Sequence, residues 1–330
     1  MIKMTVALGW RRVCALMLAA ALAPVAPVAG WAQGNARPIT LVVPFPAGGP
    51  TDVVARAVAQ HMGETLGQPM IVTNRPGAGG SIGAAAVAHA APDGLTLLVG
   101  TASLVTGPYL YKLSFDPMKD LAPVALLAKT PVFIWVTADS PFRTLPELLA
   151  AVKAKPGQYN YSSSAPTTLA HLGSLRLFEE AGAQLTHVNY RGSAQATTDF
   201  LGGVFPIYFE VGQPLASHFA ASKVRPLAVV AGKRSPLLPD VPSITEFGLS
   251  PIDAEPFMVL MAPAGTPPAV IGRLNDHARR ALQAPDVRQK LGALYFEVNE
   301  GWDPAQVGTW LHAESATWGD VIRKHGLKVD

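Results

Sequence analysis

The chain has 330 residues, of which 49% are hydrophobic and 15% are charged. This balance is typical of a globular protein and excludes a disordered chain, and the length suits two modest α/β domains or one large domain. Three of the 26 Lys and Arg residues lie in residues 1–32, which leaves 23 against 23 Asp and Glu in the rest. The formal charge of +3 therefore gives no reason to expect a nucleic-acid partner.

Residues 1–32 have the pattern of a secretory signal peptide. Lys3, Arg11 and Arg12 precede an apolar run, and small residues lead up to Ala32, where we expect cleavage. A membrane anchor is the alternative, but the unbroken apolar run at 13–23 is shorter than the roughly 20 residues that span a bilayer. We therefore predict a periplasmic protein, exported by either the general secretory or the twin-arginine route. The single cysteine, Cys14, leaves with the signal.

The first part of the exported chain alternates strands and helices. Apolar runs at 39–45, 70–75 and 95–101 predict buried strands, each followed by a loop of small residues and a candidate helix. In the first helix Val54, Val58, Met62 and Leu66 recur at every fourth position and form one apolar stripe. This βαβαβ order predicts a parallel sheet with helices on its faces.

The pattern changes at about Leu121, where residues 121–138 form a long apolar stretch interrupted by prolines. We expect this stretch to leave one sheet and enter a second, whose strands we predict at 159–164, 185–192, 204–211 and 224–231. A strand near 255–263 would return, and three amphipathic helices, with no strand of their own, would pack on the first domain. The expected crossings lie near 121–137 and 225–262. We expect the exported chain to divide into three segments, 33–124, 125–255 and 256–330. The first and last would form one lobe, and the middle segment the other.

Six loops of the predicted sheets are built of Gly, Ala, Pro, Ser and Thr: PFPAGGPTD, RPGAGGS, GTAS, SSSAPTT, YRGS and PAGTP. Ligands of α/β sheets bind at the carboxyl ends of the strands, where small side chains leave backbone N–H groups and helix N-termini accessible. Such loops favour a carboxylate or phosphate site without a dedicated Lys or Arg. Ordinary turn and capping chemistry is the alternative for any single loop.

Some side chains in these loops allow two interpretations each. Asp52 could cap its helix or bind a ligand ammonium group, and His171 could donate to a ligand or lie in the core. Arg56, Arg75 and Arg191 could reach a carboxylate or stay in solvent.

Motifs for catalysis are missing from the sequence. GAGGSIG lacks the third glycine of a dinucleotide fingerprint, PAGGPTD lacks the lysine of a phosphate-binding P-loop, and no GxSxG elbow occurs. The histidines are scattered without zinc-binding spacing. We predict a binding protein with no catalytic residues, no cofactor and no metal. The alternative is an exported enzyme that uses Asp52 and His171 as an acid–base pair.

Four segments carry a resemblance to a known family: residues 44–101, HVNYRGSAQATTDFLGG, LPDVPSITEFGL and APAGTPPAVIGRLN. They resemble the Bug-type extracytoplasmic solute receptors of tripartite tricarboxylate transporters. The resemblance implies an α/β fold with two lobes, of the Venus-flytrap type of periplasmic binding proteins, joined by two hinge-crossing strands. It implies a small-molecule carboxylate ligand and a membrane permease as partners. We expect a monomer, and a receptor that signals to a membrane sensor is the alternative role.

The resemblance also implies where the ligand binds. The first-strand loop and the NYRGS loop of the second lobe would hold the carboxyl group, with the loops at 79–81, 101–103 and 163–168 around it. Together with the helix residue considered above, the predicted ligand-binding residues are Phe45, Ala47, Gly48, Gly49, Thr51, Asp52, Gly79, Gly80, Thr101, Ser103, Ser163, Ser164, Thr168, His171, Tyr190, Gly192 and Ser193.

Besides the segment GGVFP, where an acidic residue is replaced after the paired glycines, four positions depart from the family pattern. Asn189 stands where a proline is common, Ala165 and Pro166 stand where the serine loop usually has glycines, and Phe257 takes the place of a tryptophan before the final crossing. These positions lie where side chains set specificity, so the particular carboxylate is not predicted.

Overall fold

The computed structural model describes residues 37–165, 167–190, 192–298 and 301–328. Residues 37–330 form one compact unit. The predicted signal peptide, Pro166 and Arg191 lie outside the described residues. Within the described ranges, no helix is both long enough and apolar enough to span a membrane.

The first sheet has six strands in the order β11-β4-β10-β3-β1-β2. Strands β1, β2 and β3 are parallel, as the βαβαβ pattern predicts, and β10 is antiparallel to β3 and β4. The strands are β1 (Ile39–Val43), β2 (Met70–Asn74), β3 (Thr96–Thr101), β4 (Leu121–Lys129), β10 (Phe257–Pro263) and β11 (Glu297–Val298).

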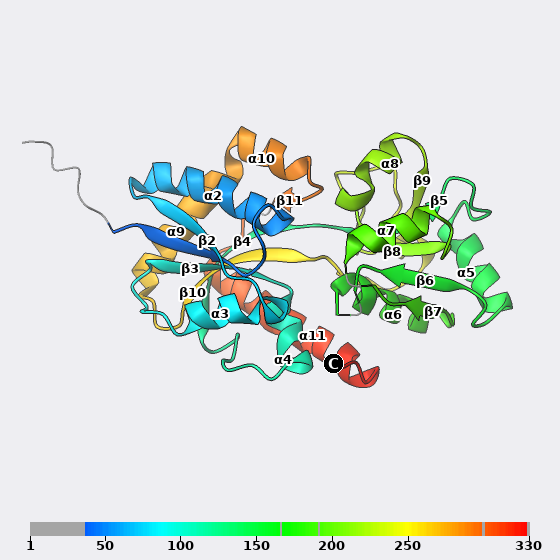
Figure 1. Cartoon of the computed structure of the whole chain (residues 1–330), viewed down its shortest axis with the longest axis horizontal. Coiled ribbons are helices and arrows are strands. Elements are labelled where there is room, and N and C mark those ends of the chain that lie inside the picture. The colour runs from blue at the N-terminus through cyan, green and yellow to red at the C-terminus, as the bar shows by residue number, and fades with distance from the viewer. Residues whose placement is uncertain (1–36, 166, 191, 299–300, 329–330) are drawn as a thin grey trace, which may run out of the picture. The chain divides into compact units, whose positions relative to one another are not determined.

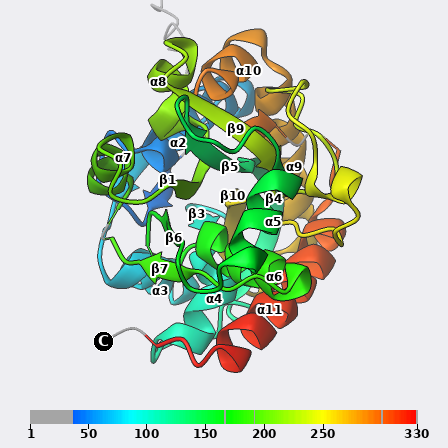
Figure 2. The same cartoon turned by 90° about the vertical axis from the view of Figure 1, so that its right-hand side faces the viewer.

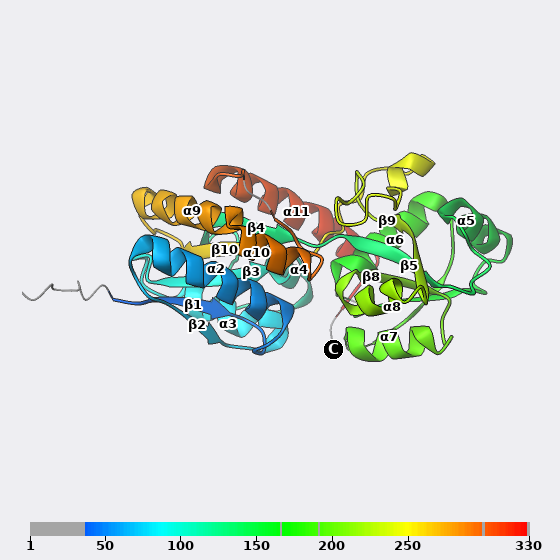
Figure 3. The ribbon, with the colours of Figure 1, turned by 90° about the horizontal axis from the view of Figure 1, so that it is seen from above.

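Helices cover both faces of this sheet (Figures 1 and 3). One face holds α2 (Pro50–Leu66), α9 (Pro268–Gln283) and α10 (Pro285–Gly292), and the other holds α3 (Ser81–Ala88), α4 (Ser103–Leu110) and α11 (Pro304–Lys324).

Helix α2 follows from its sequence. Pro50 opens it at a position that needs no N–H donor, and Gly67 closes it in the left-handed conformation with a φ of 65°. Three residues of the predicted stripe, Val54, Val58 and Met62, are fully buried against the sheet, whereas the fourth, Leu66, is partly buried. Burial of this stripe fixes the start of α2 at the carboxyl end of β1.

The second sheet has five strands in the order β7-β6-β8-β5-β9. Its strands are β5 (Val132–Thr137), β6 (Asn160–Ser163), β7 (Thr186–Val188), β8 (Ile207–Val211) and β9 (Val224–Val229). Its helices are α5 (Leu145–Ala154), α6 (Leu169–Ala181), α7 (Ser193–Leu201) and α8 (Ala216–Ala220), and this part of the molecule faces the viewer in Figure 2. Short 3₁₀ turns are η1 (Ala78–Gly80), η2 (Gln213–Leu215) and η3 (Ile244–Phe247).

Two segments cross between the sheets, as predicted. The chain passes from β4 to β5 and returns from β9 to β10. The two crossings touch each other, because the amide of Thr130 donates to the carbonyl of Pro256 over 2.8 Å.

One sequence prediction about the C-terminal segment is wrong. We expected no strand after β10, but β11 pairs antiparallel with the end of β4. This strand has only two residues, so no periodicity could reveal it.

Candidate functional site

A cavity of about 380 Å³ lies where loops of the two sheets meet. Seven of its lining residues were predicted from the sequence: Phe45, Thr51, Gly79, Thr101, Ser103, Ser164 and Thr168. Pro50, Ala102 and Thr167 lie in the predicted loops, and Phe257 is one of the positions predicted to set specificity. The sequence prediction missed Thr106, Leu110, Tyr111, Thr130, Leu169, Ala170, Glu210, Val211, Gln213, Pro256, Met258, Leu294 and Phe296.

Three helices begin at this cavity: α2 at Pro50, α4 at Ser103 and α6 at Leu169. The first-turn N–H groups of a helix have no carbonyl partner inside it. Thr168 caps α6 by accepting from the amide of His171, whereas α2 and α4 begin without any side-chain cap. The starts of α2 and α4 therefore offer N–H donors and partial positive charge to the cavity.

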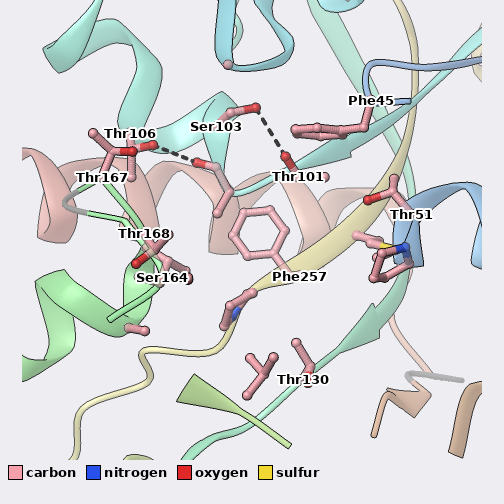
Figure 4. Close-up of a pocket in the computed structure, with 18 of the residues that line it drawn as sticks. Phe45, Thr51, Thr101, Ser103, Thr106, Thr130, Ser164, Thr167, Thr168 and Phe257 are labelled. Carbon is pink, nitrogen blue, oxygen red and sulfur yellow. Dashed lines mark hydrogen bonds between the residues drawn. The ribbon is translucent and has the colours of Figure 1, made fainter. Parts of the chain in front are cut away.

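Hydroxyl groups surround these helix starts, and Figure 4 shows them around the ring of Phe257. The hydroxyls of Thr101 and Ser103 are hydrogen bonded to each other at 3.1 Å, and that of Thr106 donates to the carbonyl of Ala102 at 3.2 Å.

Thr130 differs from the other hydroxyl residues of the wall. It is only 5% exposed, and among the described residues its hydroxyl has no hydrogen-bond partner. A buried hydroxyl without a partner is uncommon, and this oxygen has almost no surface that the cavity can reach, so Thr130 lines the wall with its other atoms.

Apolar side chains form much of the remaining wall. Phe257 packs edge-on against Trp310, with 4.6 Å between ring centroids. Leu110, Met258 and Phe296 also line the cavity. The site therefore combines helix starts and hydroxyls with an apolar wall, as expected of a pocket for an organic ligand.

Glu210 is the one carboxyl residue among the described lining residues, none of which is Lys, Arg or His. It is 3% exposed, and its carboxylate accepts from the hydroxyls of Ser193 and Tyr208 and from the amide of Val211, each at 2.9 Å. Burial raises the pKa of Glu210, and these hydrogen bonds oppose that rise. A single acidic residue in the apolar run IYFEV was the signal that could have revealed it.

The other ten predicted residues do not line this cavity: Ala47, Gly48, Gly49, Asp52, Gly80, Ser163, His171, Tyr190, Gly192 and Ser193. Their roles in ligand binding stay predictions. Several of them form hydrogen bonds to residues that do line the cavity.

Asp52 has protein partners on all sides. Its carboxylate accepts from Arg56 and from the amide of Gly48, each at 2.9 Å, and from the amide group of Asn74 at 2.9 Å. The hydrogen bond from Arg56, chiefly, lowers the pKa of Asp52 to about 2. Asp52 thus fixes the loop before α2.

His171 lies in the core, 4% exposed, stacked on Tyr161 and 4.0 Å from the ring of His187. Burial, with a smaller effect from His187, lowers the pKa of His171 to about 3, so the ring is neutral at pH 7. Asp52 and His171 thus belong to separate networks within the protein.

The predicted second-lobe loop also bonds to the protein. The Tyr190 hydroxyl donates to Asp199 at 2.7 Å, the amide of Gly192 donates to the carbonyl of Ser164 at 2.8 Å, and Ser193 donates to Glu210. The loop therefore supports Ser164 and Glu210, which do line the cavity. Across the described ranges, no group of three or more potential metal ligands occurs.

Comparison with known proteins supports the fold and the family. The family described as tripartite tricarboxylate transporter family receptor matches residues 54–327. BugT from Bordetella pertussis is 35% identical over 302 residues, which cover 89% of this chain and 91% of BugT.

Two solved structures extend the likeness to three dimensions. The periplasmic binding protein BugD shares 32% identity over 88% of this chain and 99% of its own, with a TM-score of 0.72. The R. palustris protein Rpa4515, solved with adipate, shares 31% identity over 88% of this chain and 98% of its own, with a TM-score of 0.75. These likenesses confirm the predicted two-lobed α/β fold. The chain therefore belongs to the tripartite tricarboxylate transporter receptor family, as its resemblance to the Bug-type receptors predicted.

Proposed function

We propose that this chain is an exported, periplasmic receptor that binds a small organic carboxylate in the cavity and delivers it to the permease of a tripartite transporter. Family membership supports the receptor role. The likeness to the periplasmic protein BugD and to the adipate-bound Rpa4515 supports the location and the ligand class. The predicted signal peptide at 1–32 is part of the same proposal.

The observation that carries this proposal is the start of α2 and of α4 at the cavity without side-chain caps. A carboxylate accepts several hydrogen bonds and is stabilised near a helix N-terminus. Nearby hydroxyl residues, among them Thr51 and Thr167, add further donors. The cavity thus suits a carboxylate without a positively charged side chain among its described residues.

Ligand capture would close two lobes around the acid. One lobe would comprise 33–124 and 256–330, and the other 125–255. Thr51 and Ser103 reach the cavity from helices of the first sheet, whereas Ser164 and Thr168 reach it from the second. A ligand bridging both sets binds the closed form more tightly and so favours closure.

Binding without catalysis is the simplest use of this geometry. Asp52 is paired with Arg56, and His171 is buried in the core, so neither faces the cavity as an acid–base pair.

A thermal-shift screen over small organic acids tests the proposal. A ligand that binds only the folded state adds about 2.7 kcal/mol at 100 times its Kd. We expect at least one carboxylate to give such a shift. If no acid stabilises the protein at millimolar concentration, the proposed function is wrong.

A matched pair of variants ties that binding to the cavity. Thr167→Val removes a hydroxyl that lines the cavity, so we expect the ligand-free protein to keep its stability while carboxylate affinity falls by about 10-fold. Thr309→Val is the control, because Thr309 is exposed on α11, away from the cavity, and its hydroxyl donates to the carbonyl of Ala305. Calorimetric titration measures both, and equal affinities for the two variants would remove Thr167 from the site.

A further inference from the structure

Glu210 gives the cavity an acidic end. It follows Phe209 in strand β8 of the second sheet, whereas the uncapped starts of α2 and α4 belong to the first. The cavity therefore has donors for a carboxylate on one side and a carboxyl group of the protein on the other.

The described partners of Glu210 are all neutral donors: the hydroxyls of Ser193, Tyr208 and Ser164 and the backbone amide of Val211. One of these hydroxyls belongs to Ser193, the first residue of α7, whose N-terminus also lacks a side-chain cap. The helix start that the sequence analysis assigned to the ligand carboxylate thus already has a carboxylate of the protein beside it. Its partial positive charge stabilises Glu210.

The charge balance of the wall follows from this arrangement. No described lining residue is Lys, Arg or His, so a second carboxylate on the ligand would meet Glu210 without a neutralising side chain. Burial already raises the pKa of Glu210, and a second carboxylate nearby would raise it further, whereas an ammonium group would favour the ionised form of Glu210 and supply its counter-charge. Between the two ends lie apolar side chains, including Leu110, Phe257 and Phe296.

From this geometry we propose that Glu210 determines ligand specificity: it rejects a second carboxylate and accepts a hydrogen bond from an ammonium group. The ligand is then a monocarboxylate with an apolar body and an amino group at its far end. The inference rests on the proposed function and narrows it, because a general carboxylate receptor would accept di- and tricarboxylates equally well.

Two matched series of acids test the inference by calorimetric titration of the wild-type protein. Adipate, hexanoate and 6-aminohexanoate share one carbon chain and differ at the far end. Terephthalate, 4-methylbenzoate and 4-(aminomethyl)benzoate do the same on an aromatic ring. In at least one series we expect the amino acid to bind about 10-fold tighter than the neutral member, and the diacid to bind weakest.

Glu210→Gln removes the charge and keeps the shape. We expect the preference for the amino member over the diacid to fall by about 100-fold, with the diacid gaining affinity. Glu64→Gln is the control, since Glu64 is exposed near the far end of α2. It should leave the order of affinities unchanged. If Glu210→Gln does not fold, the order of ligand affinities measured for the wild-type protein still tests the inference.

Two outcomes overturn the inference. If wild-type protein binds a diacid at least as tightly as the neutral member of the same series, Glu210 does not reject a second carboxylate, although the carboxylate receptor stands. If none of the six acids binds, the proposed ligand class is wrong. The broader acid screen then judges the receptor function separately.

Discussion

The starts of helices α2 and α7 use a carboxyl group in opposite ways. At α2, Asp52 is bonded to Arg56, so its charge is balanced inside the wall and the helix start faces the cavity. At α7, Glu210 has only neutral donors among the described residues and itself lines the cavity. Both residues are 3% exposed. Burial is therefore equal at the two helix starts, and pairing with a cation is what distinguishes Asp52 from Glu210.

The largest expected effect comes from making α2 resemble α7. Thr51→Asp places a carboxylate at the open start of α2, where it competes with the ligand and suits the helix N-terminus. We expect the tightest-binding acid of the screen to lose about 100-fold in affinity while the fold stays intact. Calorimetry measures the loss, with Thr51→Asn as the neutral control. Unchanged affinity for the Asp variant would mean that this helix start does not hold the ligand.

A smaller effect is expected from Asp52→Asn. Because the folded-state pKa of Asp52 is lowered from 3.8 to about 2, its charge stabilises the fold above pH 4, and this stability is lost as the pH falls through 2. The variant should lose on the order of 2 kcal/mol of unfolding free energy at pH 7. Its stability should also depend less on pH between 4 and 2.

Chemical denaturation at several pH values measures both quantities. Asp276→Asn serves as the comparison, because Asp276 is exposed on α9. If Asp52→Asn and Asp276→Asn behave alike, the structural role of Asp52 is refuted.

The smallest expected effect is on the pH dependence of stability in Glu210→Gln, and its sign is opposite. Burial raises the folded-state pKa of Glu210, so wild-type stability from this group is complete below its unfolded value of 4.5 and declines as the pH rises through the folded value. The stability of the variant relative to wild type should therefore increase above pH 4.5. A relative stability that does not change with pH would contradict the raised pKa.

Local patterns made much of the fold predictable. The buried stripe of Val54, Val58 and Met62 marked α2, and the proline-interrupted run after Leu121 marked the crossing from β4 to β5. Small residues after strands marked the loops that supply Thr51, Ser103 and Ser164 to the cavity. These features depend on residues close together in the sequence, so one chain suffices to find them.

The acidic end of the cavity depends on contacts that a sequence does not display. Glu210 lies 17 positions from Ser193 in the sequence. Its proposed role depends on the neutral donors around it and on the absence of a cation among its described partners. Thr130 stands out only once every nearby donor and acceptor is assigned a partner. The predicted role of Asp52 as an ammonium partner likewise depended on whether Arg56 would turn toward it.

The hydrogen bond from Thr130 to Pro256 ties one crossing to the other at the edge of the cavity. Bending one crossing without the other would break this hydrogen bond, so we expect the two crossings to bend together. We therefore expect Thr130 and Pro256 to move little when the two lobes close.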